Sequence, residues 1–142
     1  MLYSKYHYKF KVEKDLNLKL PVSMPDFEHE YCSVKDGVVY VKKGYAWDGA
    51  SGPVYNAKNT LVASLVHDVL YQAQRLNLIE HNSTNRKNAD ENFYQLLKYF
   101  GVNPIKCRIW YLAVRFFGKK STTKIQAGHS ITFYLQFFLC YE

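Results

Sequence analysis

The sequence predicts an α+β domain in which N-terminal antiparallel β-strands are followed by about three helices. From residue 8 to 13, apolar and polar residues alternate with a period of two, which is typical of a half-buried strand. After residue 60 the apolar residues recur with helical spacing, as in a helix with one buried face. The length of 142 residues fits one domain, so we take residues 1–142 as a single domain.

The strand region contains a predicted β-hairpin. Its arms are residues 31–34 and 38–41, and Lys35, Asp36 and Gly37 form the turn, because glycine adopts a positive φ without strain. Two prolines in residues 20–27 place that segment in a loop.

Three helices are predicted in the second half of the chain. Thr60 is the expected N-cap of a helix over residues 61–76, and the polar residues 77–87 form a connection. A second helix is expected over residues 88–100, and Asn-Pro opens a third over residues 104–117. A glycine follows each of these two helices, as is common at helix C-termini.

The ends of the chain carry information about location. Residues 1–10 lack the apolar core of a signal peptide, and the apolar residues 131–140 are too few to span a bilayer. The alternation within residues 131–140 favours a strand that closes the sheet. The three cysteines form no CxxC pair, which fits a reducing compartment. We therefore expect a soluble protein of a host cytoplasm or a virion.

The chain is basic, with a formal charge of +7, and aromatic residues make up 17% of it. The charge favours an anionic partner such as an acidic lipid or protein surface. The basic residues are scattered in short runs, without an arginine-rich arm or a zinc-finger signature, which argues against nucleic acid. The oligomeric state is left open.

Adjacent His67 and Asp68 on the first helix are the residues expected to carry the chemistry. Their side chains diverge by about 100°, so they face different partners. A buried aspartate needs a partner or a cation, and a histidine needs one for each ring nitrogen. Asp90 on the second helix can orient His67 if the helices are antiparallel, and Tyr71 shares the face of His67. A histidine held by an aspartate is a general-base arrangement.

A loop rich in glycine precedes this helix. With its backbone carbonyls and Asp48, it forms with Asp68 a candidate site for a hard cation. The loop residues in question are Tyr45, Trp47, Gly49, Ser51 and Gly52. Each feature also has a structural explanation: glycines form turns, tryptophan fills cores, and Asp90 lies where an acid stabilises a helix N-terminus. A functional site is favoured because the glycine-rich loop, the His67-Asp68 pair and Asp90 all occur within residues 44–90.

The chain resembles an uncharacterised family of small phage and bacterial proteins, a domain of unknown function. The motifs that carry the resemblance are WDGASGP at 47–53, SLVHDxLY at 64–71 and ADxxF at 89–93. The similarity covers about residues 31–118 and leaves residues 119–142 as an additional tail. It implies a phage or prophage setting rather than an activity.

A more distant similarity links the order of loop, His-Asp helix and Asp helix to phospholipases A2. That resemblance implies His67 as the base that activates water, Asp68 as a calcium ligand, and Asp90 with Tyr71 as support. It implies a small phage-type hydrolase that cleaves acyl esters or phospholipids with the assistance of calcium. Asp48 has no counterpart in that pattern.

Two alternatives remain open at this point. Because His and carboxylates also bind zinc, iron or manganese, Asp48, His67, Asp68 and Asp90 fit a transition-metal hydrolase as well. In the other alternative the protein is a non-enzymatic virion component or a modulator of a host protein, and the His/Asp cluster is structural. This alternative predicts that protein groups satisfy both His67 and Asp68, with no open coordination position and no cavity beside the histidine.

Overall fold

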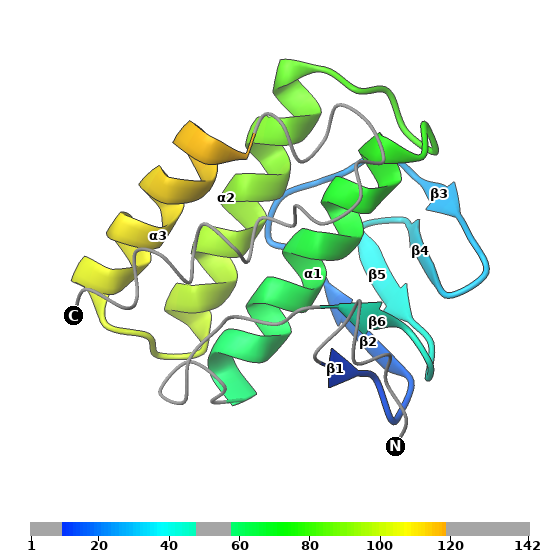
Figure 1. Ribbon diagram of the computed structural model, residues 1–142, viewed down its shortest axis with the longest axis horizontal. Coiled ribbons are helices and arrows are strands. Elements are labelled where there is room, and N and C mark those ends of the chain that lie inside the picture. Colours follow the sequence, from blue (N-terminus) through cyan, green and yellow to red (C-terminus); the bar gives the residue numbers. More distant parts are fainter. Residues whose placement is uncertain (1–9, 48–57, 119–142) are drawn as a thin grey trace.

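Along the described residues, all the strands precede the helices (Figure 1). The computed structural model describes residues 10–47 and 58–118. The strands are β1 (Phe10–Lys11), β2 (Leu16–Lys19), β3 (Phe27–Glu28), β4 (Cys32–Lys35), β5 (Val38–Val41) and β6 (Ala46–Trp47). The helices are α1 (Lys58–Arg75), α2 (Ser83–Tyr99) and α3 (Pro104–Phe117). The predicted α+β class, with strands first and three helices after them, is confirmed.

The predicted hairpin forms the centre of a four-stranded antiparallel sheet of order β2-β5-β4-β3. At its turn Asp36 has φ 51° and Gly37 has φ 77°. Two successive residues with positive φ are typical of a type I′ turn, whose twist matches that of the flanking strands. Alternate residues of β4 and β5 then face the core, including the buried Val34, Val39 and Val41.

Two parts of the strand region differ from the sequence prediction. The strand expected from residue 8 is described as the two residues of β1, and it pairs with β6 rather than with the large sheet. β2 was not predicted, because its Leu-Asn-Leu-Lys run is short and has modest β propensity. Pairing with β5 stabilises it, with Leu18 opposite Val39. Phe27, expected in a loop, begins β3.

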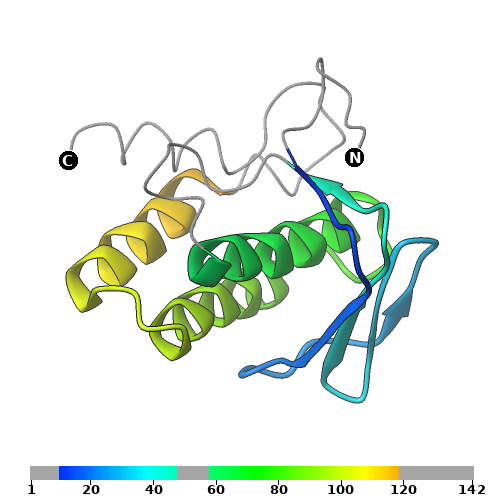
Figure 2. The same ribbon diagram turned by 90° about the horizontal axis from the view of Figure 1, so that it is seen from below.

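The three helices lie side by side, with α1 nearest the sheet and α3 farthest from it (Figures 1 and 2). α1 and α2 are antiparallel neighbours, because only a short connection joins them. Apolar side chains of α1 and α2 form the core together with the inner face of the sheet. Two hydrogen bonds add to this packing. Asn92 Oδ1 on α2 accepts a bond of 2.9 Å from Val22 N–H, and Asn92 Nδ2 donates one of 3.0 Å to the Val22 carbonyl oxygen.

The starts of the first two helices correct the sequence prediction. α1 begins at Lys58, so Thr60 lies inside the helix and is not its N-cap. α2 begins at Ser83, within the segment expected to be a connection. Asn82 caps it, since its side chain accepts a hydrogen bond of 2.7 Å from Asn85 N–H. The start of α3 at Pro104 and its end before Gly118 are as predicted.

The tail of residues 119–142, including the strand expected at 131–140, lies outside the described residues. Within the described parts of the chain, no helix is long and apolar enough to cross a membrane.

Candidate functional site

Asp90 is the centre of a buried polar cluster between the three helices. The residue is 0% exposed, and its two carboxylate oxygens meet side chains from α1, α2 and α3. Oδ1 lies 2.7 Å from His67 Nε2 and accepts a hydrogen bond of 2.5 Å from the Tyr71 hydroxyl. Oδ2 accepts a bond of 2.7 Å from Arg115 Nη1, and Arg86 Nη1 lies 3.6 Å away. One carboxylate thus joins all three helices.

The position of Asp90 within α2 removes one structural explanation for it. Because α2 starts at Ser83, Asp90 lies about two turns inside the helix, beyond the first turn where an acid interacts with the helix dipole. The antiparallel packing of α1 and α2 instead brings Asp90 opposite His67 and Tyr71, which are one turn apart on one face. The juxtaposition expected from sequence is present.

His67 is held tightly, yet one of its ring nitrogens is unused. The side chain is 1% exposed, and its ring centroid lies 4.1 Å from that of Tyr71 and 5.0 Å from that of Phe93. Nε2 faces Asp90, whereas the buried Nδ1 has no hydrogen-bond partner among the described residues. Since the Asp90 carboxylate is an acceptor, a neutral His67 carries its proton on Nε2 and leaves the lone pair on Nδ1.

Tyr71 is fixed as a hydrogen-bond donor. Burial, together with the negative charge of Asp90, raises the pKa of its hydroxyl well above the usual value. The hydroxyl is therefore protonated throughout the neutral range and always donates to Asp90. Gly118 provides the space for it, because a Cβ at that position would overlap both the Tyr71 hydroxyl and the Val114 carbonyl oxygen.

The local sequence did not identify the two arginines as part of this cluster. Arg86 lies four residues before Asp90 on α2, a spacing that itself suggests an ion pair and was a usable signal. It also donates to the carbonyl oxygens of Val114 and Arg115 at the end of α3, at 3.4 and 3.1 Å. Arg115 comes from a different helix, and only the folded chain shows that it reaches Asp90. The role of Gly118 beside Tyr71 was likewise not visible, since it was expected only to end a helix.

Asp68 belongs to a second, separate cluster, as the diverging directions of His67 and Asp68 predict. Its Oδ2 accepts a hydrogen bond of 2.6 Å from the Tyr45 hydroxyl, and Arg75 Nη2 lies 3.9 Å from its Oδ1. The Tyr45 hydroxyl also lies 2.9 Å from Gln72 Oε1. Burial, and then the charge of Asp68, raises the pKa of Tyr45 well above the usual value. Asp68 itself is 6% exposed.

The loop expected to supply carbonyl oxygens is described only in part. Asp48, Gly49, Ser51 and Gly52 lie outside the described residues, and Trp47 is placed by its backbone in β6. Tyr45 is described, and its carbonyl oxygen accepts a hydrogen bond of 2.8 Å from Val12 N–H. Its hydroxyl, rather than its carbonyl, is what contacts Asp68.

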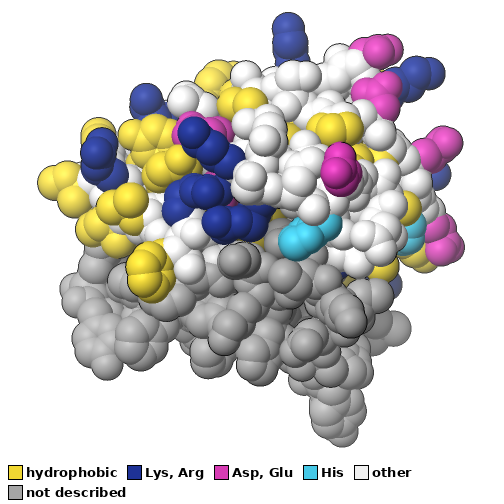
Figure 3. Space-filling model, turned by 90° about the horizontal axis from the view of Figure 1, so that it is seen from above, with side chains coloured by type: hydrophobic (Ala, Val, Ile, Leu, Met, Phe, Trp, Pro, Cys, Tyr) yellow, Lys and Arg dark blue, Asp and Glu magenta, His cyan; other side chains and the backbone are white. Residues whose placement is uncertain are grey.

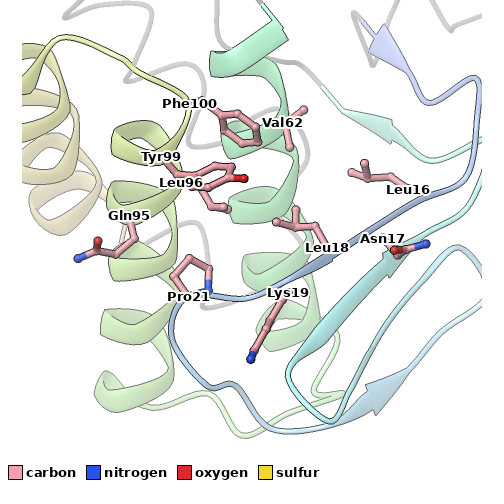
Figure 4. A pocket seen from close by; sticks show the side chains of 10 residues that line it. All are labelled: Leu16, Asn17, Leu18, Lys19, Pro21, Val62, Gln95, Leu96, Tyr99 and Phe100. Carbon is pink, nitrogen blue, oxygen red and sulfur yellow. The ribbon is translucent and has the colours of Figure 1, made fainter.

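A cavity of about 680 Å³ opens elsewhere, between β2 and the ends of α1 and α2 (Figure 4). Its lining is mainly apolar and includes Leu18, Val62, Leu96 and Phe100, but neither His67 nor Asp90. Among residues 10–47 and 58–118, no three His, Cys, Asp or Glu side chains come together in a group that could hold a metal ion.

Comparison with known proteins identifies a family without an assigned activity. Neither the curated proteins nor the solved structures contain a match to this chain. A family model described as "Protein of unknown function (DUF1353)" matches residues 26–114. The match runs from just before β3 into the last turn of α3 and includes Tyr45, His67, Asp68 and Asp90, while Arg115 is the first residue beyond it. The uncharacterised family expected from the motifs is therefore confirmed, and the chain belongs to the DUF1353 family.

Proposed function

We propose that this protein hydrolyses acyl esters, with His67 as the general base and Asp90 as the residue that orients it. The observation that carries the proposal is the asymmetry of the His67 ring. Nε2 is held by Asp90, while the buried Nδ1 has no partner among the described residues. A buried nitrogen of a purely structural histidine is expected to be hydrogen-bonded, so an unused one suggests that a reactant binds there.

The proposed reaction uses Nδ1 as the proton acceptor. A water molecule gives a proton to Nδ1 while its oxygen attacks the carbonyl carbon of the ester. The imidazolium that forms keeps its Nε2–H directed at the Asp90 carboxylate, whose negative charge stabilises it. The bond to the leaving oxygen then breaks, and the proton on Nδ1 passes to that oxygen. An acid and an alcohol are released, and His67 is neutral again.

Tyr71 and Arg115 act on this reaction through Asp90, as positioning residues. Each binds a different carboxylate oxygen, so the carboxylate cannot rotate away from His67 Nε2. The Arg115 guanidinium also forms an ion pair with Asp90 Oδ2 at 2.7 Å, on the side of the carboxylate away from His67 Nε2.

The contacts of Asp68 bear on whether calcium assists. Its carboxylate is already bonded to the Tyr45 hydroxyl, and the guanidinium of Arg75 supplies a positive charge beside it. These described residues fit a paired carboxylate better than a calcium ligand, so we derive no step through a metal. The calcium and zinc alternatives both depend on Asp48 and the loop that follows it. Both alternatives stay predictions, and the assay described below tests them by adding calcium or zinc.

The distant similarity to phospholipases A2 suggests an ester of a phospholipid as substrate. The net charge of +7 would favour an anionic lipid. The assay therefore uses two substrates: a water-soluble p-nitrophenyl ester and vesicles of phosphatidylglycerol. Each is tested with calcium, with zinc and with a chelator.

The decisive comparison is between the wild-type chain and its His67→Ala and His67→Gln variants. Loss of a general base should lower turnover by about 10²–10⁴-fold. His81→Ala is the matched control, because His81 lies outside the cluster, and it should keep full activity. Equal turnover by wild type and both His67 variants would show that His67 is not the base. Absence of turnover of either ester by the wild type, under all three conditions, would overturn the proposed reaction.

A second candidate is a non-enzymatic protein, either a phage virion component or a modulator of a host protein. The observation in its favour is that Asp90 joins side chains from three helices in a site that is almost closed to solvent. In that case the only role of the cluster is to stabilise the packing of the three helices. The wild type would then hydrolyse neither ester, while changes at His67 and Asp90 would still lower the free energy of unfolding.

A further inference from the structure

Helix α3 has two apolar faces, of which one is exposed. Cys107, Trp110, Ala113 and Val114 are buried on the side that packs against α2. On the opposite side the exposed fractions are 70% for Ile105, 37% for Ile109, 56% for Leu112 and 81% for Phe116. We call these four residues the α3 stripe.

The α3 stripe is continuous. Its members are spaced by four, three and four residues, so all four lie within an arc of about 60° around the helix axis. The distance from Ile105 to Phe116 along the axis is about 17 Å, so the stripe runs nearly the whole length of α3. A contiguous exposed apolar surface of this kind marks an interaction site in a soluble protein, whereas single exposed residues do not.

The charges around the stripe indicate the partner. α3 carries Lys106, Arg108 and Arg115 and no acidic residue. By helical geometry Arg108 lies about 70° to one side of the centre line of the stripe and Lys106 about 90° to the other. Figure 3 shows hydrophobic side chains interspersed with Lys and Arg at the end of the molecule where α3 lies. An apolar stripe flanked by cations is the pattern of a helix that lies in a membrane interface.

We infer that α3 binds the surface of an anionic membrane, with the α3 stripe inserted among the lipids and Lys106 and Arg108 at the headgroups. A second copy of the chain is a poorer occupant, because pairing two such helices brings their like-charged flanks together. Lipid headgroups supply the complementary charge without that repulsion. This inference rests on the surface of α3 and does not require His67 to be a base.

The test measures binding of the full chain to vesicles, without any assay of turnover. The wild type is expected to sediment with phosphatidylglycerol vesicles at low ionic strength, and much less with phosphatidylcholine vesicles. Ile105→Gln/Leu112→Gln should lower the partition coefficient by about tenfold or more, since two apolar side chains no longer enter the lipid. Glutamine is a good helix former, so α3 should persist, which far-UV circular dichroism checks.

Two further variants complete the design. Arg108→Gln should weaken binding to anionic vesicles by about fivefold and leave the weak binding to neutral vesicles unchanged. Tyr40→Gln removes an exposed aromatic residue of β5, on the far side of the molecule from α3, and should have no effect (Figure 1). The inference is overturned if the wild type does not bind phosphatidylglycerol vesicles. It is equally overturned if Ile105→Gln/Leu112→Gln binds as well as the wild type, or if that variant only changes the oligomeric state in light scattering.

Discussion

His67 Nε2 lies 2.7 Å from Asp90 Oδ1, in a site where the two side chains are 1% and 0% exposed. The pair joins α1 to α2, and Arg115 extends the link from Asp90 to α3. This arrangement orients the ring and leaves Nδ1 without a partner among the described residues.

Asp90→Asn should be strongly destabilising. The amide keeps the shape of the side chain but removes the negative charge that offsets Arg115 and Arg86, and part of its surface now presents N–H groups to other donors. Breaking a buried ion pair costs about 3–5 kcal/mol, and the partial exposure of Arg115 places the expected loss near the lower end. The free energy of unfolding in urea measures it.

Glu91→Gln is the matched control for that change. Glu91 is the next residue on α2 and accepts one hydrogen bond of 2.7 Å, from the Tyr111 hydroxyl. Its replacement should cost about 1 kcal/mol or less. If Asp90→Asn costs no more than Glu91→Gln, the cluster is not what holds the three helices together.

Tyr71→Phe should lower stability at neutral pH by about 1.5–3 kcal/mol, because Asp90 loses a hydrogen bond to a charged group. Burial and the Asp90 charge hold the pKa of Tyr71 well above the usual 10. An unfolded tyrosine ionises near pH 10 while the folded one stays neutral, so this contribution is complete below pH 10 and is lost as the pH rises above it.

The pH dependence therefore gives a second measurement on the same variant. The free energy of unfolding of the wild type should fall from pH 10 upward, and Tyr71→Phe should show a shallower fall. Tyr45, Tyr111 and Cys32, whose pKa values are also raised by burial, contribute to the decline that remains. Parallel curves for the two proteins would mean that the Tyr71 hydroxyl ionises alike in both states.

Gly118→Ala should displace Tyr71 and so lower stability, although Gly118 is not itself a member of the Asp90 cluster. The added methyl group overlaps the Tyr71 hydroxyl and the Val114 carbonyl oxygen, and such overpacking costs about 1–3 kcal/mol. A double-mutant cycle checks the cause. In a Tyr71→Phe background the same substitution should cost less, because one of the two overlaps is gone. Strict additivity of the two changes would place the strain entirely at the Val114 carbonyl.

Cys32 should be nearly inert toward alkylation. Burial, followed by the charge of Asp68, raises the pKa of its thiol to about 11, and only the thiolate reacts. Iodoacetamide labelling of the folded chain at pH 8, followed by mass spectrometry of the Cys32 peptide, measures the rate. Asp68→Asn should increase that rate by lowering the pKa. Labelling of wild-type Cys32 as fast as that of a free thiol would contradict the described burial.

Local sequence signals were sufficient for the hairpin and for α3. The turn at Gly37 and the Asn-Pro start of α3 are chemical requirements of those structures, so both could be located from a few residues. The start of α2 could not, because Asn82 and the residues after it are as polar as a connection. Its capping bonds, rather than its apolar periodicity, decide where it begins.

In the site, too, local sequence predicts some contacts, whereas others depend on how the helices pack. The contact of His67 with Asp90 followed from helix periodicity and one assumption, antiparallel packing of two neighbouring helices. Periodicity placed Tyr71 on the face of His67, and the structure adds its hydrogen bond to Asp90. Arg115 could not be assigned in this way, since its distance from Asp90 depends on how α3 packs across α2. Gly118 was interpretable as the end of a helix, but only the packed structure shows that its lack of a Cβ makes room for Tyr71.

The central claim is that Asp90 fixes the proton of His67 on Nε2 and leaves Nδ1 as the base. The most direct test is to determine the tautomer of His67 by ¹⁵N NMR of the full chain, with the signals assigned by their loss in His67→Gln. In the neutral form of the ring, Nε2 should carry the proton and Nδ1 should be proton-free, and in Asp90→Asn these two roles should be exchanged or evenly mixed. A neutral ring that carries its proton on Nδ1 in the wild type would contradict the central claim, because no lone pair would then be available for the proposed reaction.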